Sequence, residues 1–278
     1  MTTVGEVQRA VEALWPAATA EEWDAVGLIA GDPVDEVRRV LLAVDAVEAT
    51  AAEAVDRSAD LLLVHHPLLL RGATSVAATT PAGRVITRLV RERIALLAAH
   101  TNADAVDRGT SGALASLLGL TGVQPLVVNR VDPAKGLGRV GELPEPVALA
   151  ELVRTLAGLL PAVAGGLRAA GDPQRSVRRI AICGGAGDSL LREPAVAAAD
   201  VYITSDLRHH PASDARERHA AREGPALVDV SHWASESLWL QPAAEQLRLA
   251  LPGVEVLVSE IRTDPWDFAV PQEEHTWH

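Results

Sequence analysis

The sequence is poor in several residue types, with one cysteine, one lysine, one methionine, one tyrosine and one phenylalanine among 278 residues. Because Cys183 has no second cysteine to pair with, an internal disulfide is excluded, which suits the reducing cytoplasm. Cys183 follows the aliphatic residues 180–182, so we interpret it as a small buried side chain, with a reactive nucleophile as the alternative.

Basic residues and long apolar runs are also scarce. The chain has 25 Lys and Arg against 37 Asp and Glu, a formal net charge of -12 at pH 7. Since nucleic-acid binding depends on basic side chains that neutralise phosphates, we expect no nucleic-acid partner. No run of about 18 apolar residues occurs, and residues 1–6 lack a signal-peptide pattern. We therefore expect a cytoplasmic protein with no membrane partner.

Two adjacent histidines, His65 and His66, are the most informative feature of the sequence. They follow the aliphatic residues 61–64, which predict a buried strand that Pro67 then ends. In open α/β sheets, ligand sites lie at the carboxyl ends of strands. Because side chains alternate faces along a strand, both imidazoles serve one site only if the chain bends; alternatively, each binds one of two adjacent metal ions.

A second segment repeats this arrangement. His100 follows the aliphatic residues 94–99, again a predicted buried strand. Asp104 lies four residues beyond it, in a predicted short loop before a helix. A carboxylate can bridge two cations, which imidazole rarely does, so Asp104 is a candidate ligand.

A third segment follows the strand-like residues 226–230. His232 and Glu236 are four residues apart, which places both on one face of a helix if that helix begins by Trp233. The spacing differs from the zincin pattern, which needs two histidines around a glutamate.

These segments together supply five candidate metal ligands: His65, His66, Asp104, His232 and Glu236. A catalytic zinc site uses three protein ligands, whereas five suit two ions about 3.5–4 Å apart with a shared carboxylate and water. We therefore predict two divalent metal ions per subunit. Mixed nitrogen and oxygen ligands accept Zn, Fe, Mn, Co or Ni, so the identity of the metal stays open.

Strand-like and helix-like segments alternate along most of the chain, which predicts βαβ units in an α/β fold with mainly parallel or mixed sheets. We expect two interleaved α/β lobes. Residues 1–124 and about 225–278 would form the lobe with the metal site, and residues about 125–224 the second lobe, with no additional inserted domain. The tail histidines, His275 and His278, are not expected to be ligands.

The glycine-rich residues 184–189 follow a predicted strand. Their backbone N–H groups could hold an anion at a helix N-terminus, or they could form a plain tight turn. They match neither the Walker pattern nor the dinucleotide-binding pattern, which favours the tight turn.

The chain as a whole resembles the NIF-three-like dinuclear metal-centre family, also called GTP cyclohydrolase 1 type 2. The motifs that carry the resemblance are Trp23-Asp24-Ala25-Val26-Gly27-Leu28, Val64-His65-His66-Pro67, His100-Thr101-Asn102-Ala103-Asp104, Cys183-Gly184-Gly185-Ala186-Gly187, the segment from Tyr202 to His210, and Ser231-His232-Trp233-Ala234-Ser235-Glu236. The family usually has Asn in place of Ala25 and Gly in place of Ser205 and Ser231. None of these departures removes a ligand.

The resemblance implies a NIF-three-like fold, a homohexamer, and the same five ligands around two divalent ions. It also implies hydrolytic opening of the guanine ring of GTP, with a nucleotide as the small-molecule substrate. His100 and His210 are the candidates for catalytic proton transfer, because neutral imidazole exchanges a proton near pH 7. We expect His209 to lie on the surface.

Two functions remain open from the sequence. A metal-dependent hydrolase would polarise a substrate oxygen and activate a bridging water. A non-catalytic metal-binding, metal-delivery or regulatory assembly protein would use the same ligands. If GTP is the substrate, the loop at Gly184 is the candidate site for its triphosphate. The acidic composition and the lack of a lysine-bearing phosphate loop make tight binding of a triphosphate less obvious.

Overall fold

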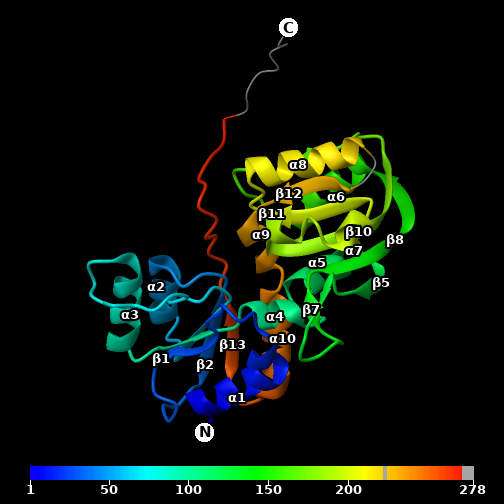
Figure 1. Cartoon of the computed structure of the whole chain (residues 1–278). Coiled ribbons are helices and arrows are strands. Elements are labelled where there is room, and N and C mark those ends of the chain that lie inside the picture. Colours follow the sequence, from blue (N-terminus) through cyan, green and yellow to red (C-terminus); the bar gives the residue numbers. More distant parts are fainter. Residues whose placement is uncertain (222–223, 271–278) are drawn as a thin grey trace.

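The computed structural model describes residues 1–221 and 224–270, which form two α/β lobes, each built around its own sheet (Figure 1). Both sheets combine parallel and antiparallel strands, which confirms the predicted α/β class. The tail histidines His275 and His278 lie outside the described residues.

The first lobe contains a five-stranded sheet in the order β1-β4-β3-β2-β13. Neighbouring strands are parallel except β1, which runs antiparallel to β4. The strands span Gly27–Ala30 (β1), Arg39–Ala43 (β2), Leu61–Val64 (β3), Ala95–Ala98 (β4) and Glu255–Val258 (β13).

Helices cover both faces of this sheet, which explains why its central strands are aliphatic throughout. One face packs against α1 and α10, and the other against α2 and α3. These helices span Val4–Leu14 (α1), Glu48–Asp56 (α2), Pro81–Arg91 (α3) and Leu240–Ala250 (α10).

The second lobe contains a six-stranded sheet in the order β5-β8-β10-β11-β12-β9. Strands β10, β11 and β12 are parallel, and the other pairings are antiparallel. The strands span Thr121–Gln124 (β5), Arg139–Ala148 (β8), Arg168–Ala170 (β9), Ser176–Ala186 (β10), Val201–Ser205 (β11) and Ala226–Val230 (β12). A separate two-stranded sheet joins Val127–Val128 (β6) to Gly136–Leu137 (β7).

Alternation along β10 divides the core of this lobe between the two faces of the sheet. Ile180 and Ile182 pack with α5, α6 and α9, whereas Ala181 packs with α7 and α8 on the other face. These helices span Thr110–Leu117 (α5), Leu149–Leu159 (α6), Pro194–Ala197 (α7), His209–Ala220 (α8) and His232–Ser237 (α9).

Strands β5 and β12 pair in the second sheet, although the predicted boundaries at 124 and 225 place both with the first lobe. Their hydrogen bonds to β8 and β11 determine this membership. After α9 the chain returns to the first lobe, where α10 packs and β13 pairs with β2.

One predicted element differs from the structure. Asp104 lies in a one-turn helix, α4 (Thr101–Ala105), and not in a loop. The residues after Ser231 form two helices, α9 and α10, because Pro242 has no N–H group to donate to the carbonyl of Leu238.

Helix α8 has no apolar periodicity to predict it, because Ala215 is its one buried residue. Among the helices within residues 1–221 and 224–270, none is both long and apolar enough to cross a membrane.

Candidate metal centre

The candidate ligands come from the ends of two adjacent parallel strands and from two short helices. His65 and His66 follow β3, and His100 follows β4, the parallel neighbour of β3. The other candidates lie in α4 and α9: Asp104, His232 and Glu236. Helix α9 begins at His232, with Ser231 as its N-cap, so the spacing of four residues places His232 and Glu236 together as predicted.

The chain bends at the histidine pair. The backbone N–H groups of His65 and His66 both donate to the carbonyl of Val44, at 3.1 and 2.9 Å. In a regular strand, consecutive N–H groups point in opposite directions, so the regular pattern ends here. The two rings consequently lie with their centroids 5.0 Å apart and contribute to one cluster.

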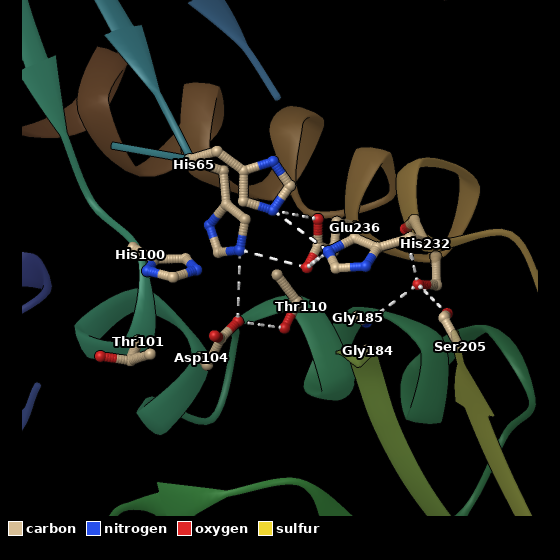
Figure 2. Close-up of polar contacts among 12 residues, drawn as sticks. His65, His100, Thr101, Asp104, Thr110, Gly184, Gly185, Ser205, His232 and Glu236 are labelled. Carbon is tan, nitrogen blue, oxygen red and sulfur yellow. Dashed lines mark hydrogen bonds and ion pairs between the residues drawn. The ribbon is translucent and has the colours of Figure 1, made fainter. Parts of the chain in front are cut away.

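The carboxylate of Glu236 lies at the centre of this cluster (Figure 2). Its Oε2 is 2.9 Å from Nε2 of His66, and its Oε1 is 2.9 Å from Nε2 of His232. Oε1 also lies 3.5 Å from Nε2 of His65, which in turn is 3.7 Å from Oδ1 of Asp104. Glu236 therefore stands between a His65–Asp104 pair and a His66–His232 pair.

Among the residues that the structure describes, two groups of three have potential ligand atoms within 4.8 Å of one another. One group is His66, His232 and Glu236, and the other is His65, His66 and His100. Asp104 belongs to neither group and is connected through its contact with His65. The structure thus brings the five predicted ligands together and adds His100 to them.

His210, the other predicted proton-transfer residue, lies elsewhere. It is exposed on the first turn of α8, with its ring centroid 5.1 Å from that of His209. His209 is exposed as well, as predicted. Within one subunit, the structure therefore brings His100 to the cluster and leaves His210 outside it.

Each of the four clustered imidazoles has its Nδ1 atom beside an oxygen acceptor. The pairs are His65 with the carbonyl of Ala99 at 3.0 Å, His66 with Asp45 at 2.7 Å, His100 with Asp24 at 2.9 Å, and His232 with Asp206 at 2.7 Å. Because carbonyls and ionised carboxylates only accept hydrogen bonds, Nδ1 donates and Nε2 remains for the cluster. Histidines that bind metals in proteins are held in this way.

Sequence reasoning did not assign roles to the three carboxylates among these acceptors, Asp24, Asp45 and Asp206. Asp24 and Asp206 lie within motifs that carry the family resemblance. That position was the one feature of the sequence that indicated a role for either residue at the site. Asp45 follows β2, the strand beside β3, so its position at the same sheet edge was a second signal.

Charges at the centre strongly shift the pKa values of the histidines. Burial lowers the pKa of His66, but the charge of Glu236 and the hydrogen bonds to Asp45 and Glu236 outweigh burial and raise it to about 11. The same balance, with Asp206 in place of Asp45, raises the pKa of His232 to about 10. In the metal-free protein, the two histidines are therefore protonated partners of Glu236.

The pKa values of the two carboxylates shift in opposite directions. Burial raises the pKa of Glu236, but the nearby charges of His65, His66 and His232 reverse this and hold it well below the usual range. Burial raises the pKa of Asp104, and the charge of His65 only partly offsets it. Glu236 is thus the anion around which the cluster is organised.

The donors present fit divalent metal ions. Among the described residues at this cluster, Nε2 of His65 is buried without a hydrogen-bond partner. It lies 3.5 and 3.7 Å from its nearest carboxylate oxygens, too far for good hydrogen bonds. An unpaired buried polar atom is costly, and a cation bound between His65 and these carboxylates would satisfy it.

The first glycines of the glycine-rich segment bond to hydroxyls beside the cluster. Strand β10 continues through Ala186, and the N–H groups of Gly184 and Gly185 donate to the hydroxyls of Ser111 and Ser235, at 3.0 and 3.1 Å. The N–H groups of these two glycines are therefore already used and are not available to an anion.

Gly185 allows the backbone to approach Glu236 closely. Its φ is +71°, and a Cβ at this position would lie 2.3 Å from Oε1 of Glu236 and 3.2 Å from Nε2 of His232. We expect Gly185→Ala to lose about 1 kcal/mol from the left-handed backbone and to displace the carboxylate. Metal affinity, measured by competition with a chelating dye, should then fall at least about tenfold, as when groups that support ligands are lost.

Gly122→Ala is the matched control for this prediction. Gly122 also has a positive φ, +62°, but a Cβ there would have nothing within 4 Å. The control should show the loss of stability without the loss of metal. Equal metal affinity in the two variants would contradict the proposed role of Gly185.

Asp24 should make stability depend on pH. Burial raises its pKa, but hydrogen bonds from His100 and Thr101 outweigh burial and lower it from 3.8 to about 2. Its stabilising contribution, about 2 kcal/mol from this shift, is therefore present above pH 4 and lost as the pH falls towards 2. Urea unfolding of wild type and Asp24→Asn should differ by this amount at pH 6 and converge below pH 4. A difference that does not change with pH would contradict it.

The fold and the site together define a two-lobed α/β protein with a histidine–carboxylate cluster where its lobes meet. The chain belongs to the Duf34/NIF3 (NGG1p interacting factor 3) family, whose model matches residues 2–265. This result confirms the family resemblance and the fold class that it implied.

Curated relatives match along nearly the whole chain. A Streptomyces coelicolor protein named GTP cyclohydrolase 1 type 2 homolog is 50% identical over 272 residues, covering 96% of this chain and 94% of its own. A Mycobacterium tuberculosis protein with the same name is 35% identical over 371 residues, covering 95% and 96%. That alignment is longer than the 278 residues of this chain, so the mycobacterial protein contains residues that this chain lacks.

Solved structures agree on the fold. The Staphylococcus aureus protein SA1388 superposes with a TM-score of 0.86 at 26% identity, covering 96% of this chain and 99% of its own. A Bacillus cereus protein related to NIF3 gives the same TM-score and coverage at 22% identity, a level that supports the fold alone.

Proposed function

We propose that this protein is a metal-dependent hydrolase that uses two divalent metal ions held by His65, His66, Asp104, His232 and Glu236. The observation that carries the proposal is the arrangement of the imidazoles: each Nδ1 is fixed by an acceptor, and the Nε2 atoms of His65, His66 and His232 lie within 3.5 Å of the Glu236 carboxylate. Bound divalent ions would polarise a substrate oxygen and lower the pKa of a bound water.

The division of the ligands supports two ions. Glu236 has one carboxylate oxygen near His66 and the other near His65 and His232. Asp104 approaches the cluster only from the side of His65. Glu236, whose carboxylate contacts three of the imidazoles, would therefore be the central ligand of the site.

His100 is the proposed proton-transfer residue. Asp24 accepts from its Nδ1, and the N–H and hydroxyl of Thr101 donate to the same carboxylate. These contacts orient the His100 ring, which lies with its centroid 5.1 Å from that of His65 and 5.5 Å from that of His66. A fixed imidazole beside the cluster can accept a proton from a water there and return it to a leaving group.

Metal analysis of the purified, untagged protein tests the proposal. We expect about two ions per chain in wild type and a marked fall in His65→Ala, with His209→Ala unchanged as an exposed control. Metal-loaded protein would then be screened for hydrolysis of cyclic amides, phosphoesters and GTP. GTP is included because the curated relatives are named GTP cyclohydrolase 1 type 2 homolog. Wild type that binds no metal after anaerobic reconstitution would overturn the proposal.

The same experiment separates the alternative function. A metal-delivery or regulatory protein would transfer its ions to an apo-acceptor and show no turnover on the panel. A cavity beside the cluster, lined by His66 and His232, supports the hydrolase instead, because a delivery site has no need of substrate-sized space.

We also propose a homo-oligomer, a homohexamer on the basis of the family resemblance, and a cytoplasmic location on the basis of the single cysteine. Light scattering coupled to size-exclusion chromatography measures the molar mass of the protein in solution. A monomeric mass at micromolar concentration would contradict it.

A further inference from the structure

A cavity of about 700 Å³ opens beside the metal centre and lies within the size range of small-molecule sites. Its inner end is lined by His66 and His232, two of the candidate ligands. Its walls include three aromatic side chains: Trp233, Trp266 and Phe268. The side chains of Trp266 and Phe268 are largely exposed, at 67% and 78%, so their ring faces are available to a bound molecule.

The aromatic wall belongs to the C-terminal segment 263–269, which runs from the first lobe past α9 (Figure 1). The hydroxyl of Thr263 donates to Asp45, the carboxylate that holds His66. The hydroxyl of Ser231, beside His232, donates to Asp264 at 2.6 Å. The segment is therefore fixed to the groups that orient two candidate ligands.

The net charge of the cavity and the adjoining metal centre is negative. Four carboxylates line it: Asp45, Asp206, Asp229 and Asp264. Among the described lining residues, Arg168 is the one lysine or arginine, and it is paired with Asp229. Asp104 and Glu236 bring the number of nearby carboxylates to six. Two divalent ions and Arg168 together would supply fewer positive charges than these carboxylates supply negative charges.

A triphosphate would therefore meet a negative cavity without free cationic side chains, and like charges in a partly enclosed site repel strongly. A flat ring would instead find aromatic faces, and a positive charge on that ring would gain from both the carboxylates and the aromatic faces. This combination of aromatic and acidic side chains suits nitrogen heterocycles without phosphate groups.

We propose that the substrate of this site is a planar nitrogen heterocycle, neutral or positively charged, that stacks on Trp266 and Phe268, and that the cavity discriminates against nucleoside triphosphates. This proposal names the substrate class of the proposed hydrolase and rests on that function.

Three compounds that share one ring system test the discrimination: guanosine, positively charged 7-methylguanosine, and GTP. Their binding to the full chain would be measured by isothermal titration calorimetry, first without metal and then after metal loading. We expect 7-methylguanosine to bind at least as tightly as guanosine, and GTP at least tenfold more weakly than guanosine, in both states. GTP binding as tight as guanosine, or no saturable binding of either nucleoside up to millimolar concentrations, would overturn the proposal.

Variants locate the bound ring. Trp266→Ala and Phe268→Ala should each weaken nucleoside binding at least about fivefold. Val270→Ala should not, because Val270 is exposed directly after this segment and does not line the cavity. Asp264→Asn should reduce the preference for 7-methylguanosine over guanosine. Unchanged nucleoside affinity in both aromatic variants would show that the ring binds elsewhere.

Metal content distinguishes this proposal from the proposed function. The aromatic variants leave the candidate ligands in place, so they should retain wild-type metal stoichiometry. If the protein binds two metals and hydrolyses a phosphorylated compound, the inference about substrate class fails and the hydrolase stands. If nucleosides bind but no metal does, the hydrolase fails, and the substrate class, which rests on it, falls with it.

Discussion

The Glu236→Gln variant is expected to lose both of the proposed metal ions. Glutamine has nearly the same shape as glutamate but no negative charge, and Glu236 is the group whose two oxygens contact the ligands on both sides of the centre. Affinity for each ion should fall by more than about 100-fold, the upper end of what loss of a supporting group costs. The proposed hydrolytic activity should fall below detection as metal affinity is lost.

The metal-free form of this variant should also be unstable. His66 and His232 have their Nε2 atoms 3.2 Å apart, and Glu236 is the buried charge that compensates both. Removing one partner from a buried ionic cluster costs about 3–5 kcal/mol. Urea unfolding of the chelator-treated proteins at pH 7 measures this difference.

Two controls make the Glu236 prediction specific. Glu245→Gln removes an exposed carboxylate on α10 that pairs with exposed Arg108, and it should change neither metal content nor stability. Asp206→Asn removes the support of His232 and should weaken metal binding by about 10–100-fold without abolishing it. Retention of two ions in Glu236→Gln would contradict the proposed role of Glu236 as a metal ligand.

The Arg139→Met variant is expected to lose about 3–5 kcal/mol of stability. The side chain of Arg139 is buried, and its guanidinium donates to the carbonyls of Gly136, Gly138, Ala105 and Val106. Methionine fills a similar volume but removes the donor of these four hydrogen bonds, although the carbonyl of Val106 keeps the N–H of Gly109. Each acceptor left unsatisfied costs about 1–3 kcal/mol before relaxation. The midpoint of thermal unfolding should fall by roughly 10 °C.

Loss of Arg139 should also affect the metal centre. Ala105 ends α4 and directly follows Asp104, so the guanidinium fixes the end of the helix that carries this ligand. The ion bound on the side of His65 should therefore be released at lower chelator concentration than the other. Arg108→Met, an exposed neighbour, should leave stability within about 0.5 kcal/mol of wild type. A loss below about 1 kcal/mol in Arg139→Met would contradict the prediction.

The positions of the candidate ligands in the fold follow from local patterns in the sequence. Residues 61–64 and 94–99 are aliphatic runs, and the structure places His65, His66 and His100 directly after the strands that these runs form. His232 and Glu236 share a helix face because their spacing of four residues matches the period of a helix. These features depend on neighbours in the chain, so the sequence predicts them.

The sequence predicted the helices and the membership of the two sheets only in part. Helix α8 is amphipathic only weakly and buries Ala215 alone, so no apolar period revealed it. The membership of β5 and β12 in the second sheet depends on pairing with β8 and β11, partners distant in the chain. Strand pairing depends on tertiary contacts, which a local sequence pattern does not encode.

The sequence by itself determined the ligand types, the strand ends that carry them and the family. The tertiary structure alone decided which carboxylates hold the imidazoles, because Asp24 reaches His100 across 76 residues, Asp206 reaches His232 across 26, and Asp45 reaches His66 across 21. It also decided that His210 lies outside the cluster and that an aromatic and acidic cavity adjoins it. Hydrogen bonds between distant residues require the packed fold to bring donor and acceptor within about 3 Å, and the chain acquires that geometry only when both lobes are formed.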